Sequence, residues 1–402
     1  MVCLDKSLTG LNLYLCFDDK LSSLRWSSKA PIDEWSVCLP DGKKDIATLA
    51  KLSNLPFDPL PPDHFVKMMK TVGCNLSDNI DWRRVLKPRD FKVHLKRLIE
   101  DARGILSKGC TDYYSNVFLP SKHSLEQLEP AKINISQLTR SLSSETSDSQ
   151  LSALNSFSPV AGGFSRKIYY DQLGSRTGRL TVKSGPQILT LRKDLRKILV
   201  SRYQSGKIYQ LDFISLEARL ALILAGETAE RDVYEQISKA VLKNQYSRSL
   251  VKIATLSILY GIGRIELAHR LEISPKEAAS LSRKISQFFR IKDRISYLEE
   301  QSRTCNSITN AYGRVIDSTN APRHVLCNNF IQSSAVDVAL LGFSSIIRSI
   351  REKQRRVHPI FIIHDALLLD VHPEESLEDL IELGQIIPGQ ESLFYLKQSN
   401  LF

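Results

Sequence analysis

Apolar and polar positions follow different periods along the chain, and these periods predict both strands and helices. Residues 207–213 have the pattern of a strand that runs directly into a helical pattern over residues 216–225. Residues 274–277 (Ser-Pro-Lys-Glu) supply the N-cap, first-turn proline and glutamate that open a helix. Residues 359–371 have the pattern of two apolar strands that flank a polar pair. From about residue 166 onward we therefore expect a mixed α and β structure.

The N-terminal region has weaker patterns. Residues 1–60 combine short apolar runs with turn residues, and residues 55–63 are rich in proline, which predicts a small β-containing piece and a linker. Between residues 81 and 108, apolar side chains recur at helical spacing and predict an amphipathic helix with a cationic face. That face is either a solvated surface or one that follows phosphates. Residues 136–158 are rich in serine and are expected to be flexible or loosely structured.

Composition and charge narrow the class of protein. The 402 residues are 42% apolar and 25% charged, as in ordinary globular proteins. Lysine and arginine number 55 against 44 acidic residues, and the formal charge of +11 favours a polyanionic partner. We find no apolar run of about 18 residues and no secretory signal. The seven cysteines form no CxxC pair, so we expect neither a zinc site nor a disulfide framework, and a cytoplasmic location.

Three short segments carry candidate chemistry, and the first surrounds Asp212. This residue stands near the end of the strand predicted over residues 207–213, so its carboxylate is expected at the rim of a sheet. Glu217 and Arg219 follow on the next predicted helix. Taken alone, Asp212 is better explained as a residue that caps this helix, which is the commoner case.

The second segment is a helix with two cations. Arg248, Lys252, Leu256 and Tyr260 stand four residues apart, so they follow one helix face, which ends at Tyr260-Gly261. The two cations have no acidic partner within a turn of this apolar helix. They suit the β and γ phosphates of a nucleotide, because lysine supplies a point charge and arginine a planar fork.

The third segment is the polar pair His364-Asp365 within residues 359–371. The apolar strands on both sides place this pair at the tip of a hairpin, a setting in which polar groups are costly without a partner. We expect the hairpin to bring Asp365 beside a second carboxylate. Two aspartates from separate strands can hold two Mg²⁺ ions roughly 3.5–4 Å apart, which activates a 3′-hydroxyl and stabilises a leaving pyrophosphate.

In this order, the three segments resemble motifs A, B and C of the family A DNA polymerases, the DNA polymerase I family. The resemblance covers about residues 166–375. Further segments that fit it are Thr177-Gly178-Arg179-Leu180, Phe288-Phe289, Tyr312-Gly313-Arg314, and the helix with Asn328, Gln332, Ala335 and Asp337. The resemblance implies an α+β fold, the right-hand polymerase, in which a palm with an antiparallel sheet carries helical fingers and a thumb.

The resemblance also implies a division of the chain. The expected regions are an N-terminal extension of unknown role (1–80), a thumb-like helical region (81–165), a first palm segment with motif A (166–230), fingers with motif B (231–322) and a second palm segment with motif C (323–402). On this interpretation the cationic helix of the thumb holds duplex phosphates, and its contribution weakens with salt.

Roles for individual residues follow from the resemblance. Asp212 and Asp365 would be the catalytic carboxylates that bind two Mg²⁺ ions, for which Mn²⁺ can substitute, with the Phe213 carbonyl as a further ligand. Lys252 would bind the triphosphate and act as a general acid toward pyrophosphate. Glu217 would be the steric gate that excludes a 2′-hydroxyl. The other residues implied in dNTP binding are Arg248, Leu256, Tyr260, Tyr234 and Ser215.

The resemblance implies primer-template DNA and dNTPs as partners. The residues expected to bind DNA are Arg179, Asn328, Gln332, His364 and Arg314. Donors in the minor groove can check the shape of a base pair without reading its sequence, because each correct pair presents purine N3 and pyrimidine O2 acceptors there. We expect a monomer that does not associate with membranes.

Three positions depart from the family pattern. Leu256 stands where an aromatic residue is usual, Ala366 where an acid usually follows His-Asp, and Tyr234 where a histidine often binds the triphosphate. Two firm carboxylates still suffice for two metal ions. No 3′→5′ exonuclease motif occurs in residues 1–165, so the expected function is a DNA polymerase without proofreading, a layout that suits a phage enzyme.

Two alternatives stay open. A single-subunit RNA polymerase shares the Arg/Lys-Tyr-Gly helix and the His-Asp hairpin, but Glu217 and the Thr-Gly-Arg-Leu segment favour a DNA polymerase. A catalytically idle DNA-binding replication protein would fit Leu256 and Ala366, but the retained aspartates and Lys252 disfavour it. Replication, gap filling and lesion bypass are all compatible with the sequence.

Overall fold

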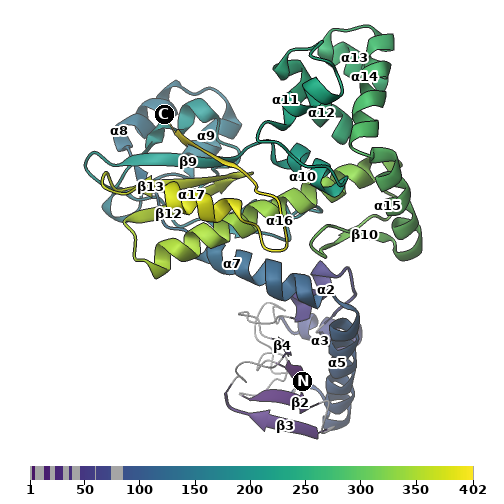
Figure 1. The fold of residues 1–402 in the computed structure, drawn as a ribbon. Helices are drawn as coiled ribbons and strands as arrows, with labels where there is room; N and C mark the ends of the chain where they lie inside the picture. The colour runs from purple at the N-terminus through teal and green to yellow at the C-terminus, as the bar shows by residue number, and fades with distance from the viewer. Residues whose placement is uncertain are drawn as a thin grey trace. The chain divides into compact units, whose positions relative to one another are not determined.

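The structure is a computed structural model that describes residues 2–4, 13–18, 23–29, 36–38, 46–58, 60–73 and 85–401. It divides into two compact units, each described here by itself (Figure 1). The first unit comprises Met1–Ser115 with Gly313–Val315, and the second comprises Asn116–Tyr312 with Ile316–Phe402. The division at Ser115 falls inside the segment 81–165, for which the sequence predicts one thumb-like region.

The first unit combines a small sheet with helices. Its elements are β1 (Val2–Leu4), β2 (Tyr14–Asp18), β3 (Ser23–Ser27), β4 (Ser36–Cys38), α2 (Ile46–Leu52), α3 (Asp63–Thr71), α5 (Pro88–Lys108) and α6 (Thr111–Tyr113). The strand order is β3-β2-β1-β4, in which β1 is antiparallel to β2 and parallel to β4. This sheet confirms the β-containing piece expected within residues 1–60.

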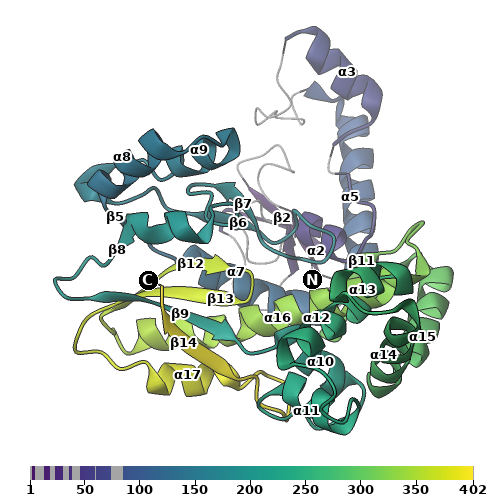
Figure 2. The same cartoon turned by 90° about the horizontal axis from the view of Figure 1, so that it is seen from above.

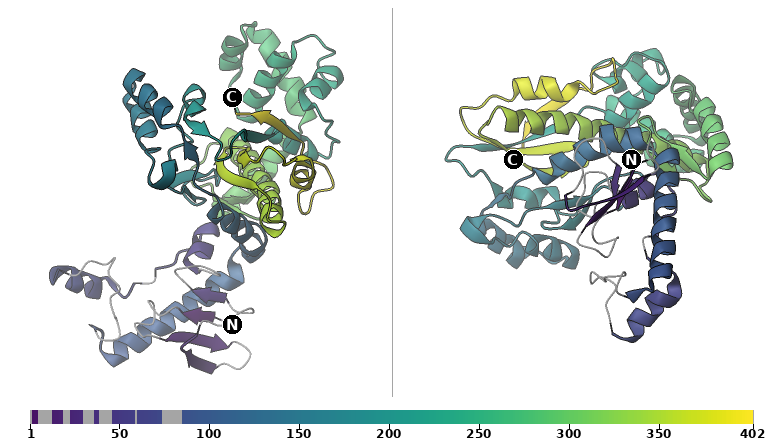
Figure 3. Two further views of the ribbon diagram at one scale, coloured as in Figure 1. Left: turned by 90° about the vertical axis from the view of Figure 1, so that its left-hand side faces the viewer. Right: turned by 90° about the horizontal axis from the view of Figure 1, so that it is seen from below.

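Helix α5 confirms the amphipathic helix predicted between residues 81 and 108 (Figure 3). It begins at Pro88, because a proline at the first helical position loses no internal hydrogen bond. The residues that recur at helical spacing are all buried: Phe91, Leu95, Leu98, Ala102 and Ile105. Arg83 and Arg84, the first cations of the predicted cationic face, lie outside the described residues.

A four-stranded antiparallel sheet forms the centre of the second unit. Its strands are β9 (Lys207–Phe213), β12 (Val357–Ile363), β13 (Ala366–Val371) and β14 (Leu396–Asn400), in the order β12-β13-β9-β14. The register places Ala366 opposite Asp212 on one side of β9 and Lys397 opposite it on the other. The strand at 207–213 and the hairpin at 359–371 are therefore confirmed, with His364 and Asp365 between its two strands.

One long helix and several short ones lie beside this sheet. Helix α16 (Arg323–Glu352) packs against α17 (Glu378–Gln385), and Figures 1 and 2 show both on one side of the strands. Helix α16 is long and apolar enough to cross a membrane, but 83% of its most apolar window is buried within the protein, as in a core helix. Helix α10 (Leu216–Leu224) packs against α16, and α7 (Leu119–Glu126) does so as well.

A body of helices lies beside the palm-like sheet (Figure 1, upper right). It consists of α11 (Val233–Ala240), α12 (Arg248–Leu259), α13 (Arg264–Leu271), α14 (Pro275–Phe288) and α15 (Ile291–Cys305). These helices share one apolar core that also includes residues of α10 and α16. The predicted capping box is present, because Ser274 accepts a hydrogen bond from the Glu277 amide while Glu277 accepts one from the Ser274 amide.

The expectation of a loose stretch over residues 136–158 is wrong. Two helices occupy it, α8 (Ile135–Ser144) and α9 (Asp148–Asn155), and the second unit buries Leu138 and Leu154 from their apolar sides. Asn134 caps α8 by accepting a hydrogen bond from the Gln137 amide at 3.0 Å. The hydroxyls of Thr139 and Ser143 donate hydrogen bonds to backbone carbonyls one turn earlier, so these polar side chains are satisfied within the helix.

Short elements complete the structure. They are η1 (Tyr114–Phe118), β5 (Lys132–Ile133), η2 (Ala161–Gly163), β6 (Tyr169–Asp171), β7 (Thr181–Ser184), η3 (Lys193–Ile198), β8 (Leu199–Val200), β10 (Ser307–Thr309) and β11 (Val315–Asp317). Three two-stranded sheets pair β5 with β8, β6 with β7 and β10 with β11. The mixture of helices and antiparallel sheets confirms the α+β class.

Candidate active site

A cavity of about 510 Å³ lies in the second unit where β9, the β12–β13 hairpin, α12 and α16 meet. Its lining includes all but two of the site residues predicted from the sequence. These are Arg179, Asp212, Phe213, Ser215, Glu217, Tyr234, Arg248, Lys252, Leu256, Tyr260, Gln332, His364 and Asp365. The fold therefore gathers residues that are spread over nearly half of the sequence.

Two carboxylates enter the cavity from neighbouring strands. Asp212 lies near the end of β9, and Asp365 lies in the tight turn between β12 and β13, where the amide of Phe213 donates to the Asp365 carbonyl at 3.1 Å. The turn is possible because His364 adopts a left-handed backbone conformation with φ of 55°. Asp212 is thus held near the end of β9, and Asp365 is held in the turn that precedes the neighbouring strand β13.

The electrostatics of the pair are unusual for aspartates. Burial raises the pKa of Asp212 to about 6, and the neighbouring Asp365 carboxylate adds to this rise. Burial also raises the pKa of Asp365. Nearby cations oppose both shifts, Lys252 among them, but they do not cancel them. The positive charge near these two carboxylates does not balance their negative charge. Carboxylate oxygens are the ligands that hard divalent cations prefer.

The two cations of α12 line the same cavity. The sequence shows no acid within a turn of them, but the fold supplies one, Asp232, from the N-cap of α11. Arg248 Nε donates to Asp232 at 2.6 Å, and the guanidinium lies 5.6 Å from the centre of the Tyr234 ring. This pair leaves 55% of the Arg248 side chain exposed. Lys252, one turn along, is exposed and has no ion pair within the described segments of the chain.

A chain of hydrogen bonds fixes Glu217. Its carboxylate accepts from Arg179 at 3.0 Å and also from the hydroxyl of Tyr260. Arg179 is fixed in turn, because the Gln332 amide oxygen, when it faces the guanidinium, accepts from it at 3.1 and 3.2 Å while the amide nitrogen donates to Thr177. The Thr-Gly-Arg segment and the residues of motifs A and B thus meet in one network.

One charged residue that lines the cavity is absent from the sequence-based prediction. Lys397 on β14 lies directly opposite Asp212 on β9, and its charge lowers the pKa of that aspartate. No local pattern marks Lys397, because its importance depends on the pairing of two strands far apart in the sequence. A departure from the family pattern, Ala366, lies opposite Asp212 on the other side and is buried.

The structure does not bring two of the predicted DNA-binding residues to the cavity. Asn328 lies on α16 one turn before Gln332, and its side-chain oxygen is buried without a hydrogen bond in the described segments of the chain. Arg314 belongs to the first unit, where it is 5% exposed and donates to the hydroxyl of Tyr113 at 3.2 Å.

Comparisons with known proteins place these features in a family. The model of DNA polymerase family A matches residues 121–387. DNA polymerase I of Helicobacter pylori is 24% identical over 263 residues, which are 57% of this chain and 29% of that protein. DNA polymerase I of Geobacillus stearothermophilus is 24% identical over 258 residues, or 56% and 29% of the two chains. The matches thus span less than a third of these relatives.

A solved structure shows the same fold. The polymerase domain of Pol1 from M. smegmatis, in complex with DNA primer-template and dNTP, superposes with a TM-score of 0.64 at 14% sequence identity. The match covers 89% of this chain and 81% of that one. This likeness confirms the right-hand polymerase fold expected from the sequence. The family model matches well over half of the residues of this chain, and the chain therefore belongs to DNA polymerase family A.

Proposed function

We propose that this protein is a template-directed DNA polymerase that adds dNTPs to the 3′-hydroxyl of a primer. One observation carries the proposal: Asp212 and Asp365, from β9 and from the turn before its neighbour β13, line one cavity together with Arg248 and Lys252. Carboxylates and cations around one cavity suit a metal-bound triphosphate and a hydroxyl that attacks it. Family membership supports the same chemistry.

Members of DNA polymerase family A depend on metal ions, and the donor set of this cavity fits Mg²⁺. Asp212 and Asp365 would hold two ions with the help of the Phe213 carbonyl, and their raised pKa values reflect a pair of carboxylates that the protein's own cations do not balance. When bound, such ions lower the pKa of the primer hydroxyl and neutralise charge on the phosphates. Mn²⁺, which also prefers oxygen ligands, would substitute.

The protein's own residues bind the nucleotide and move one proton. Arg248, oriented by Asp232 and Tyr234, would grip the triphosphate with the exposed side of its guanidinium. Lys252 would bind the same phosphates and donate a proton from Nζ to the leaving pyrophosphate. Tyr234 and Ser215 line the cavity beside them, and Leu256 offers an apolar surface to the sugar and base.

Glu217 would select deoxynucleotides. Arg179 and Tyr260 hold its carboxylate in place, so the side chain cannot rotate away from a 2′-hydroxyl without losing both hydrogen bonds. Arg179 and Gln332 would also face the minor groove of the primer-template duplex, and His364 would contact the primer end. The active form would be a monomer located in the cytoplasm. Residues 1–165 contain no exonuclease motif, so mismatched primer ends would not be removed.

Primer extension on a defined template tests this function. With Mg²⁺, we expect addition of the complementary dNTP, and at least about 100-fold less efficient addition of the matching rNTP. Glu217→Ala should raise rNTP addition and leave dNTP addition measurable. A mismatched primer should not be shortened before extension.

The alternatives give different results in the same assay. Preferential use of rNTPs would identify an RNA polymerase. Duplex binding without extension by any nucleotide, under conditions in which the protein is folded, would identify an idle DNA-binding protein. Either result overturns the proposed function.

A further inference from the structure

The second unit buries one arginine completely. Arg219 is the fourth residue of α10 and is 1% exposed, and it is the bulkiest of the fully buried side chains among the described residues. Within the described residues it forms no ion pair with a carboxylate. A buried cation is costly unless other groups satisfy it, so the groups around Arg219 indicate what it does.

Backbone carbonyls take the place of a carboxylate. Arg219 Nη1 donates to the Ala229 carbonyl at 3.1 Å. Its Nη2 donates to the next two carbonyls, those of Glu230 and Arg231, at 2.6 Å and 2.8 Å. The guanidinium also lies over the ring of Tyr395, 4.7 Å from its centre. The planar fork of the guanidinium thus fixes where three successive carbonyls lie.

The three carbonyls belong to the connection between α10 and α11. Residues 225–232 of this connection form neither helix nor strand, so no regular backbone ladder fixes their position. Gln236 helps to hold the same connection, because its amide donates to the Thr228 carbonyl at 2.7 Å and accepts from the Glu230 amide at 2.9 Å. Side chains from both flanking helices therefore set the path of this segment.

The last of these carbonyls is next to the residue that orients Arg248. Asp232 follows Arg231 in the chain and is the N-cap of α11, where one carboxylate oxygen accepts from two amides of the first turn at 3.1 Å and 3.2 Å. The other oxygen accepts from Arg248 Nε at 2.6 Å. Two hydrogen bonds, joined through Arg231 and Asp232, therefore connect Arg219 to Arg248.

The same arginine is tied to the strand that carries Asp212. Strand β9 ends at Phe213 and α10 begins at Leu216, so two residues separate the two elements. The Arg219 amide donates to the Ser215 carbonyl at 2.8 Å, and α10 packs against α16. Arg219 thus joins the element that follows a proposed metal ligand to the segment that orients a proposed triphosphate ligand.

We propose that Arg219 is a positioning residue for dNTP binding. By holding the carbonyls of residues 229–231, it fixes Asp232 and so orients the guanidinium of Arg248. The proposal rests on the proposed polymerase function, because that function makes Arg248 a ligand of the triphosphate. Arg219 acts through Arg248 and not by contact with the nucleotide, since it is not among the described residues that line the active-site cavity.

Equilibrium binding of the complementary dNTP, with Mg²⁺ and a primer-template whose primer lacks a 3′-hydroxyl, tests the proposal without catalysis. Arg219→Met removes every donor to the three carbonyls and leaves an unbranched apolar side chain. We expect the Kd for dNTP to rise about tenfold, because misplacing a binding group by about 1 Å can cost about a hundredfold. Arg219→Lys keeps the charge and three donors, so its Kd should stay within about threefold of wild type.

A second background shows whether the effect passes through Arg248. In Arg248→Ala the positioned guanidinium is absent, so adding Arg219→Met should change the Kd for dNTP by less than about twofold. A purely structural role for Arg219 would weaken dNTP binding by the same factor in both backgrounds. Equal factors in the wild-type and Arg248→Ala backgrounds would therefore overturn the proposal.

Arg294→Met is the matched control. Arg294 is also partly buried, lies 5.0 Å from the centre of the Phe330 ring, and makes its one hydrogen bond among the described residues to the Leu224 carbonyl at the end of α10. Its loss should lower the free energy of unfolding but leave the Kd for dNTP within about twofold of wild type. A tenfold rise in this control would show that any loss of a buried arginine has the same effect.

A milder variant decides the question if Arg219→Met does not fold. Tyr395→Leu keeps the carbonyl contacts of Arg219 but removes the ring against which the guanidinium lies. We expect the Kd for dNTP to rise about threefold in the wild-type background and to stay unchanged in Arg248→Ala. The absence of any rise in the folded variant would overturn the proposal.

Extension of an ordinary primer reports on the polymerase function separately. If wild type binds dNTP but does not extend the primer, the polymerase function is wrong, and Arg219 is still judged by dNTP binding, which needs no catalysis. If wild type extends the primer and Arg219→Met binds dNTP as tightly as wild type, the positioning role alone is wrong. If wild type binds no dNTP, both are wrong.

Discussion

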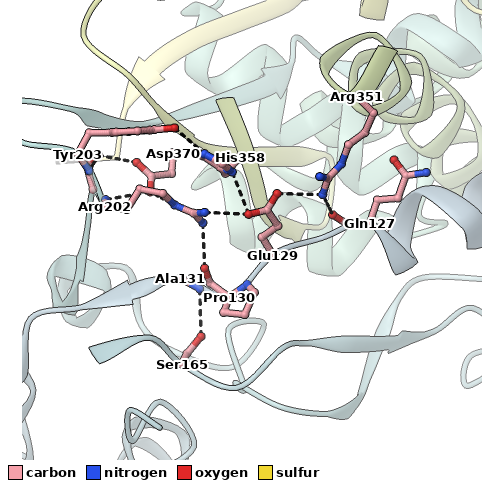
Figure 4. Close-up of polar contacts among 11 residues, drawn as sticks. Gln127, Glu129, Pro130, Ala131, Ser165, Arg202, Tyr203, Arg351, His358 and Asp370 are labelled. Atoms are coloured by element: carbon pink, nitrogen blue, oxygen red, sulfur yellow. Dashed lines mark hydrogen bonds and ion pairs between the residues drawn. The ribbon is translucent and has the colours of Figure 1, made fainter. Parts of the chain in front are cut away.

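The carboxylates at the two ends of one sheet differ in how many hydrogen-bond donors surround them. Strand β13 begins next to Asp365 at the proposed active site and carries Asp370 near its other end. Asp370 is 1% exposed, yet it accepts hydrogen bonds from the Ser201 hydroxyl at 2.5 Å and from the Arg202 amide and Nε at 3.0 Å each (Figure 4). Asp365 is less buried and has no such set of donors within the described residues.

Glu129 extends the contrast. It accepts from Arg202 at 2.8 Å and from Arg351 at 2.9 Å, and His358 lies 2.9 Å away on the other side (Figure 4). Burial pushes the pKa of Glu129 upward, but hydrogen bonds from His358 and Arg202 outweigh it and bring the pKa to about 2. At Asp212 the same burial, with a second carboxylate nearby, brings the pKa to about 6. We refer to Glu129, Arg202, Arg351, His358 and Asp370 as the polar network.

We interpret the difference as a division between carboxylates that serve the fold and carboxylates that serve the proposed function. Donors from the protein satisfy the polar network, so it joins the segment before β5 to β12, β13 and α16 and stabilises their packing. The nearby cations do not balance the charge of the two aspartates of the proposed active site. This deficit of positive charge is the basis on which we propose that the site binds an external cation.

The largest effect is expected from Asp365→Asn. This change removes one of the two carboxylates, and we expect single-turnover extension to fall by at least about a thousandfold. Stability should be unchanged or higher, because the amide is neutral in a partly buried position. Duplex binding should persist. Extension within tenfold of wild type would show that Asp365 is not required.

The polar network should show the opposite behaviour. Arg202→Ala leaves Asp370 and Glu129 with fewer donors in a buried position, and we expect a loss of about 3–5 kcal/mol in the free energy of unfolding, measured with urea. Extension per folded molecule should be nearly unchanged. The matched control is Arg356→Ala, which breaks an exposed pair with Glu374 and should hardly move the unfolding midpoint. Equal effects of the two changes would contradict the account.

The pH dependence of stability should have opposite signs at the two ends. Asp212 has a higher pKa in the fold than its ordinary value of 3.8, so its contribution is fully present below 3.8 and is lost as pH rises through about 6. Glu129 has a lower pKa than its ordinary value of 4.5, so its contribution is present above 4.5 and is lost as pH falls toward 2.

Unfolding measured without divalent ions checks these signs. Between pH 4 and pH 7, the free energy of unfolding should fall by about 2 kcal/mol more in wild type than in Asp212→Asn. This difference includes a reduction for screening of the Asp212 charge by solvent. Relative to Glu129→Gln, wild type should lose stability as pH falls below 4.5. If the stability of wild type relative to each variant changes with pH in the same direction, Asp212 and Glu129 do not differ in the way that their pKa values predict.

The smallest expected effect concerns Lys397. Its removal in Lys397→Ala takes away a charge that lowers the pKa of Asp212, so this pKa should rise further. The acidic limb of the pH–rate profile should then move to higher pH, and the KM for dNTP should increase about fivefold. Lys397→Arg keeps the charge and should restore the profile. An unchanged profile in Lys397→Ala would leave Lys397 without a role.

Local patterns predict the elements that carry the proposed catalytic groups. The alternation around Asp212, the four-residue spacing of Arg248 and Lys252, and the apolar strands around His364-Asp365 each depend on neighbours within a few positions. The structure forms β9, α12 and the β12–β13 hairpin from these segments. Family resemblance, rather than periodicity, supplied the roles of the individual residues.

Long-range pairing could not be predicted in the same way. Lys397 faces Asp212 only because β14 pairs with β9 in one register, and Asp232 reaches Arg248 only because α11 packs against α12. The polar network joins Glu129, Arg202 and Asp370 across large gaps in the sequence. Helices α8 and α9 were missed because their serines resemble those of a loop until the burial of Leu138 and Leu154 is known.

Divalent-cation binding tests the central contrast most directly. Titration of Mn²⁺ into the complex with a terminated primer-template and dNTP should show two bound ions for wild type and for Glu129→Gln. Asp212→Asn should lose at least one ion, because its site has one carboxylate fewer. Unchanged binding in Asp212→Asn, or an equal loss in Glu129→Gln, would contradict the claim that only one end of the sheet is built for a metal.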